Sequence, residues 1–238
     1  MNEFLRRLFE GRTPWGTLDV SPASRGIWQR VRLTVYPPGI THAERRALIR
    51  DLEDLPARQW ATPSLCPGWD VHDVLAHLVD DARTTRLGFL RRLAAARFDF
   101  DRCNPRGVAR ERRADPRDTL AAFRAVSGRT TSAPAAPATR LVEAFVHGED
   151  IRRPLSLTRD RPAGPVAEAL RHQLRTSTKL GGGKERAAGL RLVATDADLD
   201  AGTGPEVRGG VLALLLAVSG RPVGPEELTG PGAAALVS

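Results

Sequence analysis

The sequence of 238 residues has few residues of the kinds that identify a protein class directly. It contains two cysteines, one methionine, one tyrosine and no apolar run longer than Val211–Val218. A membrane span needs roughly 20 apolar residues, so we expect none here. Met1–Trp15 mixes charged residues with apolar ones and lacks the apolar centre of a secretory signal, which indicates a cytoplasmic location. Cys66 and Cys103 are too few for a disulfide framework and lack the spacing of a zinc knuckle, so we expect both to be reduced.

Lysine is nearly absent, although the chain has a formal net charge of +8. Lys179 and Lys184 are the only lysines among 36 basic residues, which indicates a compositional bias toward arginine. The most basic stretch, residues 91–117, contains only Phe98 and Phe100 as aromatic residues and has no nucleic-acid-binding motif. The charge therefore predicts a non-specific attraction for anions, and we expect no nucleic-acid partner.

Helix caps and apolar periodicity predict five helices after an irregular extension formed by residues 1–40. Thr41 and Glu44 have the spacing of a capping box, as do Asp70 and Asp73. The expected helices are Thr41 to about Leu55, Val71 to about Ala96, Pro116–Val126 behind the N-cap Asp115, Thr139–Arg152, and about Pro165–Leu180. We expect the connection around residues 101–105 to be a loop.

The pattern changes after the three glycines Gly181–Gly183. Leu190–Thr195 and Pro205–Arg208 have the character of short strands, and Gly210–Ser219 predicts an apolar helix. The fold class expected is mainly α, with a helical bundle followed by a small α+β module. The corresponding division is 1–40 for the extension, 41–182 for the bundle and 183–238 for the carboxy-terminal domain.

Three side chains on the predicted helices are candidate metal ligands. Glu143 and His147 are four residues apart, so they share one face of a helix that is otherwise mostly apolar. A bare pair of this kind is more often a surface contact, but burying it in an apolar helix is costly unless something pairs it. His77, on the side of its helix that can face the bundle, is the expected third ligand. His72 is rotated by about 140° from His77 and cannot point at the same ion.

A His–Glu–His ligand set leaves one position of a tetrahedral zinc ion open, as in catalytic rather than structural sites. Zinc in such a site can ionise a water or hold a thiol as thiolate. His42 and His172 have no partner at useful spacing and are expected outside the site. Cys66 is interpreted as a turn-packing residue, although a catalytic thiol stays open. Gly183-Lys184 lacks the remainder of a phosphate-binding loop.

Two segments together resemble the mycothiol-dependent maleylpyruvate isomerase family. They are LCPGWDVHDVLAHL at residues 65–78 and EAFVHGED at residues 143–150, and GLRLVATD at 189–196 resembles the family's carboxy-terminal domain. The resemblance runs from about Thr41 to the end of the chain. It implies a DinB-like four-helix bundle with a divalent metal, whose ligands in this sequence would be His77, Glu143 and His147.

The resemblance also implies a metal- and thiol-dependent isomerase or transferase. Its partners would be mycothiol and a small electrophilic substrate, such as maleylpyruvate. A metal-dependent hydrolase, a transferase that uses another thiol, and a non-catalytic metal-binding regulator stay open, because a family does not determine one reaction. A catalytic arginine is expected in the carboxy-terminal domain, where Arg208 or Arg221 would bind a substrate carboxylate through two parallel hydrogen bonds. Either arginine could instead cover a helix end or pair with Glu206 or Glu226.

Overall fold

A computed structural model describes residues 39–85, 87–88, 91, 100–130 and 136–237. The predicted extension 1–40 therefore lies almost wholly outside the described residues. Within the described part, no helix has the length and the apolar character needed to cross a membrane. The described residues belong to one compact unit, Tyr36–Ser238.

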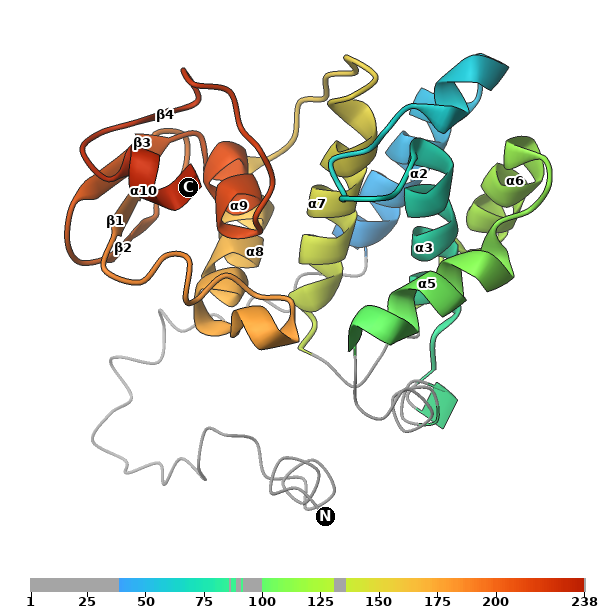
Figure 1. Cartoon of the computed structure of the whole chain (residues 1–238), viewed down its shortest axis with the longest axis horizontal. Coiled ribbons are helices and arrows are strands. Elements are labelled where there is room, and N and C mark those ends of the chain that lie inside the picture. Colours follow the sequence, from blue (N-terminus) through green and yellow to red (C-terminus); the bar gives the residue numbers. More distant parts are fainter. Residues whose placement is uncertain (1–38, 86, 89–90, 92–99, 131–135, 238) are drawn as a thin grey trace. The chain divides into compact units, whose positions relative to one another are not determined.

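Helices predominate in the described part, and a small sheet follows them in the chain (Figure 1). The α-helices are α2 (Gly39–Leu52), α3 (Val71–Arg83), α5 (Phe100–Glu111), α6 (Pro116–Val126), α7 (Thr139–Arg152), α8 (Ala163–Arg175), α9 (Val211–Val218) and α10 (Ala233–Val237). Two short 3-10 helices are η2 (Ala57–Ala61) and η3 (Thr178–Leu180). The strands are β1 (Arg191–Ala194), β2 (Asp200–Gly202), β3 (Glu206–Gly209) and β4 (Leu228–Thr229). The predicted fold class, mainly α with a small α+β part, is confirmed.

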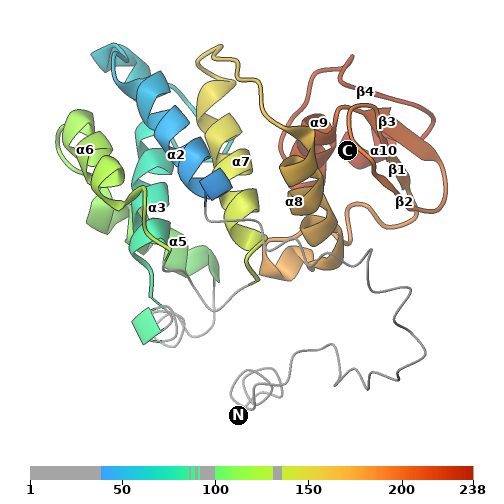
Figure 2. The same ribbon diagram turned by 180° about the vertical axis from the view of Figure 1, so that it is seen from behind.

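Four helices share the first hydrophobic core. Leu52 of α2, Leu75 of α3, Phe123 of α6 and Ile151 of α7 are among its fully buried members. Figures 1 and 2 show these helices grouped together, with α5 packed beside α3. This arrangement places α3 against α7, the two helices that carry the predicted metal ligands.

A second core joins the other side of α7 to α8, α9 and the sheet. Phe145 of α7 and Leu170 of α8 are buried in it together with Leu192 of β1 and Leu214 of α9. The sheet has the order β2-β1-β3-β4, in which β1 and β3 are parallel and the outer pairs are antiparallel. The helix α7 thus contributes to both cores. The division of the chain at residues 182 and 183 stays a prediction.

Several local predictions are confirmed because they depend on interactions between near neighbours in the sequence. Both α6 and α7 have the predicted bounds. Asp70 and Asp73 form the predicted capping box at the start of α3, and Asp115 caps α6 ahead of Pro116. The predicted strands and the apolar helix of the carboxy-terminal part also form, as β1, β3 and α9.

The ends of three predicted helices differ from the structure. Helix α3 ends at Arg83, because the hydroxyl of Thr84 donates to the carbonyl of Asp80 and its backbone is extended. Helix α2 already begins at Gly39, so the predicted capping box at its start was wrong, and the Glu44 carboxylate accepts from Arg159 instead. The fifth helix, α8, ends at Arg175 and is followed by the separate turn η3.

The loop predicted around residues 101–105 was wrong, because α5 spans Phe100–Glu111 and contains Pro105. Tertiary packing outweighs the proline. A Cβ at Gly107 would clash with the carboxylate of Asp80 on α3, so glycine permits the close approach of the two helices. Glu111 and Arg83 add an ion pair between α5 and α3.

Candidate metal centre

The three predicted metal ligands converge where α3 packs against α7. His77 lies on α3, whereas Glu143 and His147 lie one turn apart on α7. The Glu143 Oε2 atom lies 3.4 Å from His77 Nε2 and 3.1 Å from His147 Nε2. One possible ligand atom from each residue falls within 4.8 Å of the others. The side chains are 12%, 27% and 13% exposed, in chain order, so the cluster is shielded but can be reached by solvent.

The ring of His147 is oriented by a carboxylate on its far edge. His147 Nδ1 lies 2.8 Å from Oδ2 of Asp150, which is fully buried at the next turn of α7. Because a carboxylate can only accept, Nδ1 carries a proton, and Nε2 on the opposite edge of the ring faces Glu143. A carboxylate behind the ring is the usual support of a metal-bound histidine.

The ring of His77 is oriented by aromatic neighbours instead. Its centroid lies 5.3 Å from that of Trp69 and 4.7 Å from that of His147. His77 Nδ1 is a buried atom with no hydrogen-bond partner among the described residues, and Glu143 Oε2 is buried between the two histidines without a well-aligned hydrogen bond. Unsatisfied polar atoms of this kind need a ligand or water to offset the cost of burial. Two imidazoles and a carboxylate are the donor set that zinc accepts, so the cluster fits a divalent ion.

The electrostatics of the cluster match a site built for a cation. Burial raises the pKa of Glu143, but the charge and hydrogen bonds of His147 outweigh it and hold that pKa well below its usual value. Burial likewise lowers the pKa of His147, whereas Glu143 raises it more strongly, so that pKa lies well above its usual value. At Asp81, four residues after His77, burial and the nearby Glu143 charge raise the pKa to about 6. A cation in the cluster would stabilise the carboxylates of Glu143 and Asp81, and it would take the place of the proton that Glu143 favours on His147.

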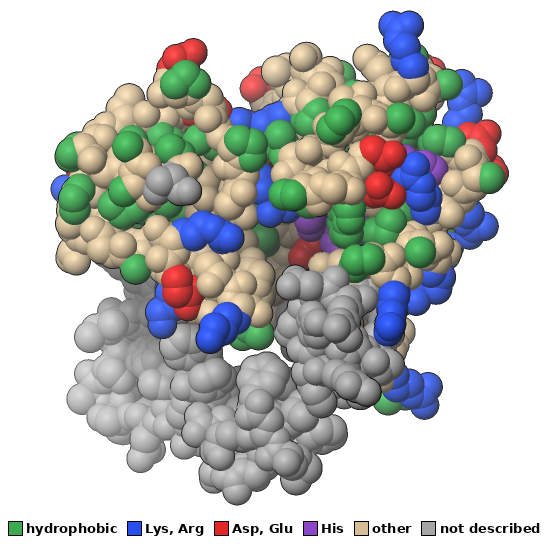
Figure 3. Space-filling view, in the orientation of Figure 1, with side chains coloured by type: hydrophobic (Ala, Val, Ile, Leu, Met, Phe, Trp, Pro, Cys, Tyr) green, Lys and Arg blue, Asp and Glu red, His purple; other side chains and the backbone are tan. Residues whose placement is uncertain are grey.

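The loop between η2 and α3 brings two further side chains to the cluster. Its ends are joined by hydrogen bonds from Val71 N to Thr62 O and from Ser64 N to Trp69 O, and Gly68 has a φ of 78° in the turn. The loop is fastened to α7 by a bond from Leu65 N to Asp150 O. Trp69 therefore lies against His77, and Cys66 lies near His147. On the face in Figure 3, histidine side chains are seen within a recess.

Arg221 also reaches the cluster, from the turn that follows α9. Its Nε and Nη2 donate to the two carboxylate oxygens of Asp150, each at 2.9 Å. Nη2 also donates to Cys66 Sγ at 3.1 Å, and Nη1 donates to the carbonyl of Ser219 at 3.0 Å. Four of the five guanidinium donors thus have partners among the described residues. In this arrangement Arg221 has one N–H left, so the expected pair of parallel bonds to a substrate carboxylate would require it to move.

The other singled-out residues lie apart from the cluster. Arg208 is 47% exposed on β3 and pairs with Glu206, which is the alternative left open by the sequence. His72 bonds to Thr119 Oγ1 at 2.7 Å between α3 and α6, in agreement with its exclusion from the site. His42 bonds to the carbonyl of Arg129 at an exposed position. The side chain of Cys103 lies outside the described part of the structure.

Cys66, His147 and Asp150 form a second group that could hold a metal ion. Arg221 donates to Cys66 and to Asp150, so the guanidinium already supplies the positive charge on this side. A metal ion bound to this second group would be repelled by the positive guanidinium of Arg221. The group formed by His77, Glu143 and His147 is therefore the better candidate for the metal site.

Asp150, Cys66 and Trp69 were not predicted as part of the site. Asp150 could have been found from spacing, since Glu143, His147 and Asp150 follow at intervals of four and three residues along one helical face. For Cys66 and Trp69 the sequence shows only their place in a turn. Their contacts depend on how the loop packs on α7.

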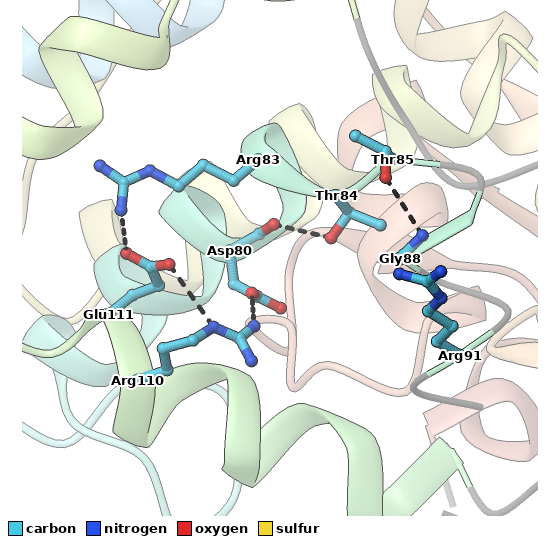
Figure 4. Close-up of a pocket in the computed structure, with 8 residues that line it drawn as sticks. All are labelled: Asp80, Arg83, Thr84, Thr85, Gly88, Arg91, Arg110 and Glu111. Atoms are coloured by element: carbon cyan, nitrogen blue, oxygen red, sulfur yellow. Dashed lines mark hydrogen bonds and ion pairs between the residues drawn. The ribbon is translucent and has the colours of Figure 1, made fainter. Parts of the chain in front are cut away.

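A separate pocket of about 360 Å³ lies between α3 and α5, and its polar side chains bind one another (Figure 4). Arg110 contacts both Asp80 and Glu111, and Glu111 also pairs with Arg83. Because these charges are largely compensated within the pocket wall, the pocket does not compete with the His–Glu–His cluster as the candidate site.

The fold and the cluster define a helical protein in which facing helices bring together two histidines and a glutamate. Residues 41–136 match the sequence model described as the mycothiol maleylpyruvate isomerase N-terminal domain. The resemblance seen in the sequence is thereby confirmed. Residues 1–53 match a family of unknown function. No curated protein matches the chain.

Two solved structures share the fold. They are the crystal structures of mycothiol-dependent maleylpyruvate isomerase and of a histidine-to-alanine mutant under the same name, with TM-scores of 0.53 and 0.52. Each is 15% identical to this chain, and each match covers 83% of this chain and 94% of the other. The shared fold therefore extends from the helical bundle into the carboxy-terminal part.

Proposed function

We propose that His77, Glu143 and His147 hold one divalent metal ion, with zinc the best suited to the donor set. The convergence of their donor atoms within 4.8 Å carries this proposal. It is supported by the buried Glu143 Oε2 between the two histidines and by the Asp150 carboxylate behind His147. Three protein ligands would leave a coordination position for a further ligand.

The function that fits this centre is thiol-dependent catalysis on a small electrophile. A zinc ion bound here would supply the charge that holds a thiol as thiolate at neutral pH. The domain family of residues 41–136 supports mycothiol as the thiol, and addition or transfer of the thiol, including isomerisation of maleylpyruvate, as the reaction. The family match supports an enzyme, and we place its activity in the cytoplasm.

The chain's own residues would orient the reactants and keep bulk water away. Trp69 covers one side of His77, and Arg221 places a positive charge beside His147 through Asp150. The one guanidinium N–H that has no partner among the described residues would be free to donate to an anionic electrophile. We assign no such role to Arg208, because its side chain is exposed and pairs with Glu206 on the same strand.

Metal analysis of the full chain tests the ligand assignment. The wild type should hold about one zinc per chain after loading and desalting, and His77→Ala and His147→Ala should lose it. His42→Ala is the matched control, since His42 makes only an exposed bond to a carbonyl. Unchanged zinc content in both ligand variants would refute the assignment.

Turnover assays then test the reaction class. We expect conversion of maleylpyruvate or a related electrophile only with mycothiol present, and none after zinc is removed by a chelator. Full turnover in water without any thiol would instead identify a hydrolase. Zinc binding without turnover under either condition, across a panel of electrophiles, would favour a non-catalytic metal-binding protein.

A further inference from the structure

Asp150 joins three side chains that come from separate parts of the sequence. It is fully buried on α7, and its Oδ2 accepts from His147 Nδ1 at 2.8 Å. Both of its oxygens accept from Arg221, each at 2.9 Å, and Oδ2 also accepts from the thiol of Cys66 at 3.2 Å. His147 belongs to the bundle, Cys66 to the loop before α3, and Arg221 to the turn after α9.

We propose that Asp150 is a positioning residue that fixes His147 and Arg221 relative to each other, so that metal affinity depends on this buried carboxylate. The inference rests on the proposed function, because it concerns the metal ligand His147. It goes further by assigning a role to a residue outside the ligand set.

The chemistry requires a carboxylate at this position. Both oxygens of an aspartate accept hydrogen bonds, so one side chain serves the imidazole and the guanidinium at once. An asparagine has a single accepting oxygen, and its amide group would face donors of either His147 or Arg221. The anionic partner also makes the far nitrogen of the imidazole a stronger ligand, and its orientation keeps Nε2 aimed at Glu143.

A purely structural role for Asp150 would give a different result. In that case its loss would cost folding stability only, as for any buried ion pair. Helix α7 offers a matched comparison two residues further on, where Arg152 Nε donates to Asp51 Oδ2 at 2.7 Å. Asp51→Asn, on α2, disrupts an arginine–aspartate pair that also involves α7 without touching His147.

Zinc titration of the metal-free full chain against a chromophoric chelator compares the wild type with Asp150→Asn and Asp51→Asn. We expect zinc affinity to fall about 10–100-fold in Asp150→Asn and to stay within about threefold of the wild type in Asp51→Asn, since loss of an outer hydrogen-bond partner has this effect on metal sites. Equal affinities in the two variants, with the wild type binding zinc, would overturn the inference alone. A wild type that binds no zinc would instead overturn the proposed function.

A second measurement on the wild type covers the case in which Asp150→Asn does not fold. Nitrogen-15 NMR of the histidine-labelled, zinc-loaded chain reports which ring nitrogen carries the proton. We expect His147 to be protonated at Nδ1, facing Asp150, and ligated through Nε2. Ligation through Nδ1 would show that Asp150 does not support the ring and would overturn the proposal.

Discussion

Replacing Arg221 by alanine should destabilise the protein by about 3–5 kcal/mol, because it leaves the buried carboxylate of Asp150 without its cation. Asp150 is fully buried and the Arg221 side chain is only 18% exposed, so solvent cannot replace the lost partner easily. The two bonds between them are 2.9 Å long, and each charge-assisted bond contributes about 1.5–3 kcal/mol. The bond to His147 remains and keeps the cost from being larger.

Arg208→Ala is the matched surface control. The Arg208 side chain is 47% exposed, and its partner Glu206 keeps an ion pair with Arg191, so the expected change is within about 0.5 kcal/mol. Urea unfolding of the metal-free chains, followed by far-UV circular dichroism, measures both variants. Arg221→Lys should fall between the wild type and Arg221→Ala, because lysine keeps the charge but loses the paired bonds.

The reasoning is refuted if Arg221→Ala unfolds at the same urea concentration and with the same slope as Arg208→Ala. Such a result would mean that the pair with Asp150 does not contribute to the folded state in solution. Any comparison of turnover between Arg221→Ala and the wild type has to be made at a temperature at which both are folded, since loss of folding would otherwise be mistaken for loss of a catalytic group.

Two further predictions concern histidines on α3. Burial lowers the pKa of His72 in the folded protein below its unfolded value of about 6.5. The neutral ring therefore contributes its full stability above that pH. As the pH falls from there toward the lowered pKa, the free energy of unfolding decreases by no more than about 1.4 kcal/mol per pH unit. The free energy of unfolding should decrease less between pH 7.5 and pH 5.5 in His72→Gln than in the wild type. Equal decreases would contradict this prediction. Trp69→Ala should weaken zinc binding several-fold, because the Nδ1 atom of His77 has no hydrogen-bond partner and the ring depends on the indole. In a chelator competition, Trp69→Phe should bind zinc nearly as well as the wild type. Unchanged zinc affinity in Trp69→Ala would show that the indole does not support the His77 ring.

The candidate ligands could be predicted because helical spacing is a local property. Glu143 and His147 share a helix face whatever surrounds them, and their place in an apolar helix indicated a need for a partner. The choice of His77 over His72 also followed from helix geometry. The structure brings these ligands together, and their binding of a metal stays a prediction.

The choice between Arg208 and Arg221 could not be made from the sequence. Each lies beside a glycine at one end of the same apolar helix, so their local patterns are alike. Only the packing of α9 against the remaining elements places Arg221 on Asp150 and leaves the side chain of Arg208 exposed on β3. The partners lie 71 residues apart in the chain, a separation that no local pattern encodes.

By itself the sequence determined the helices whose ends carry their own signals. Asp70 caps α3 and Asp115 caps α6 through bonds to residues two or three positions ahead, so these starts need no distant partner. Tertiary structure decided the helix at Phe100–Glu111, which contains a proline and packs against α3. It also decided the contacts of Asp150, because a buried carboxylate is stabilised only by the donors that folding brings to it.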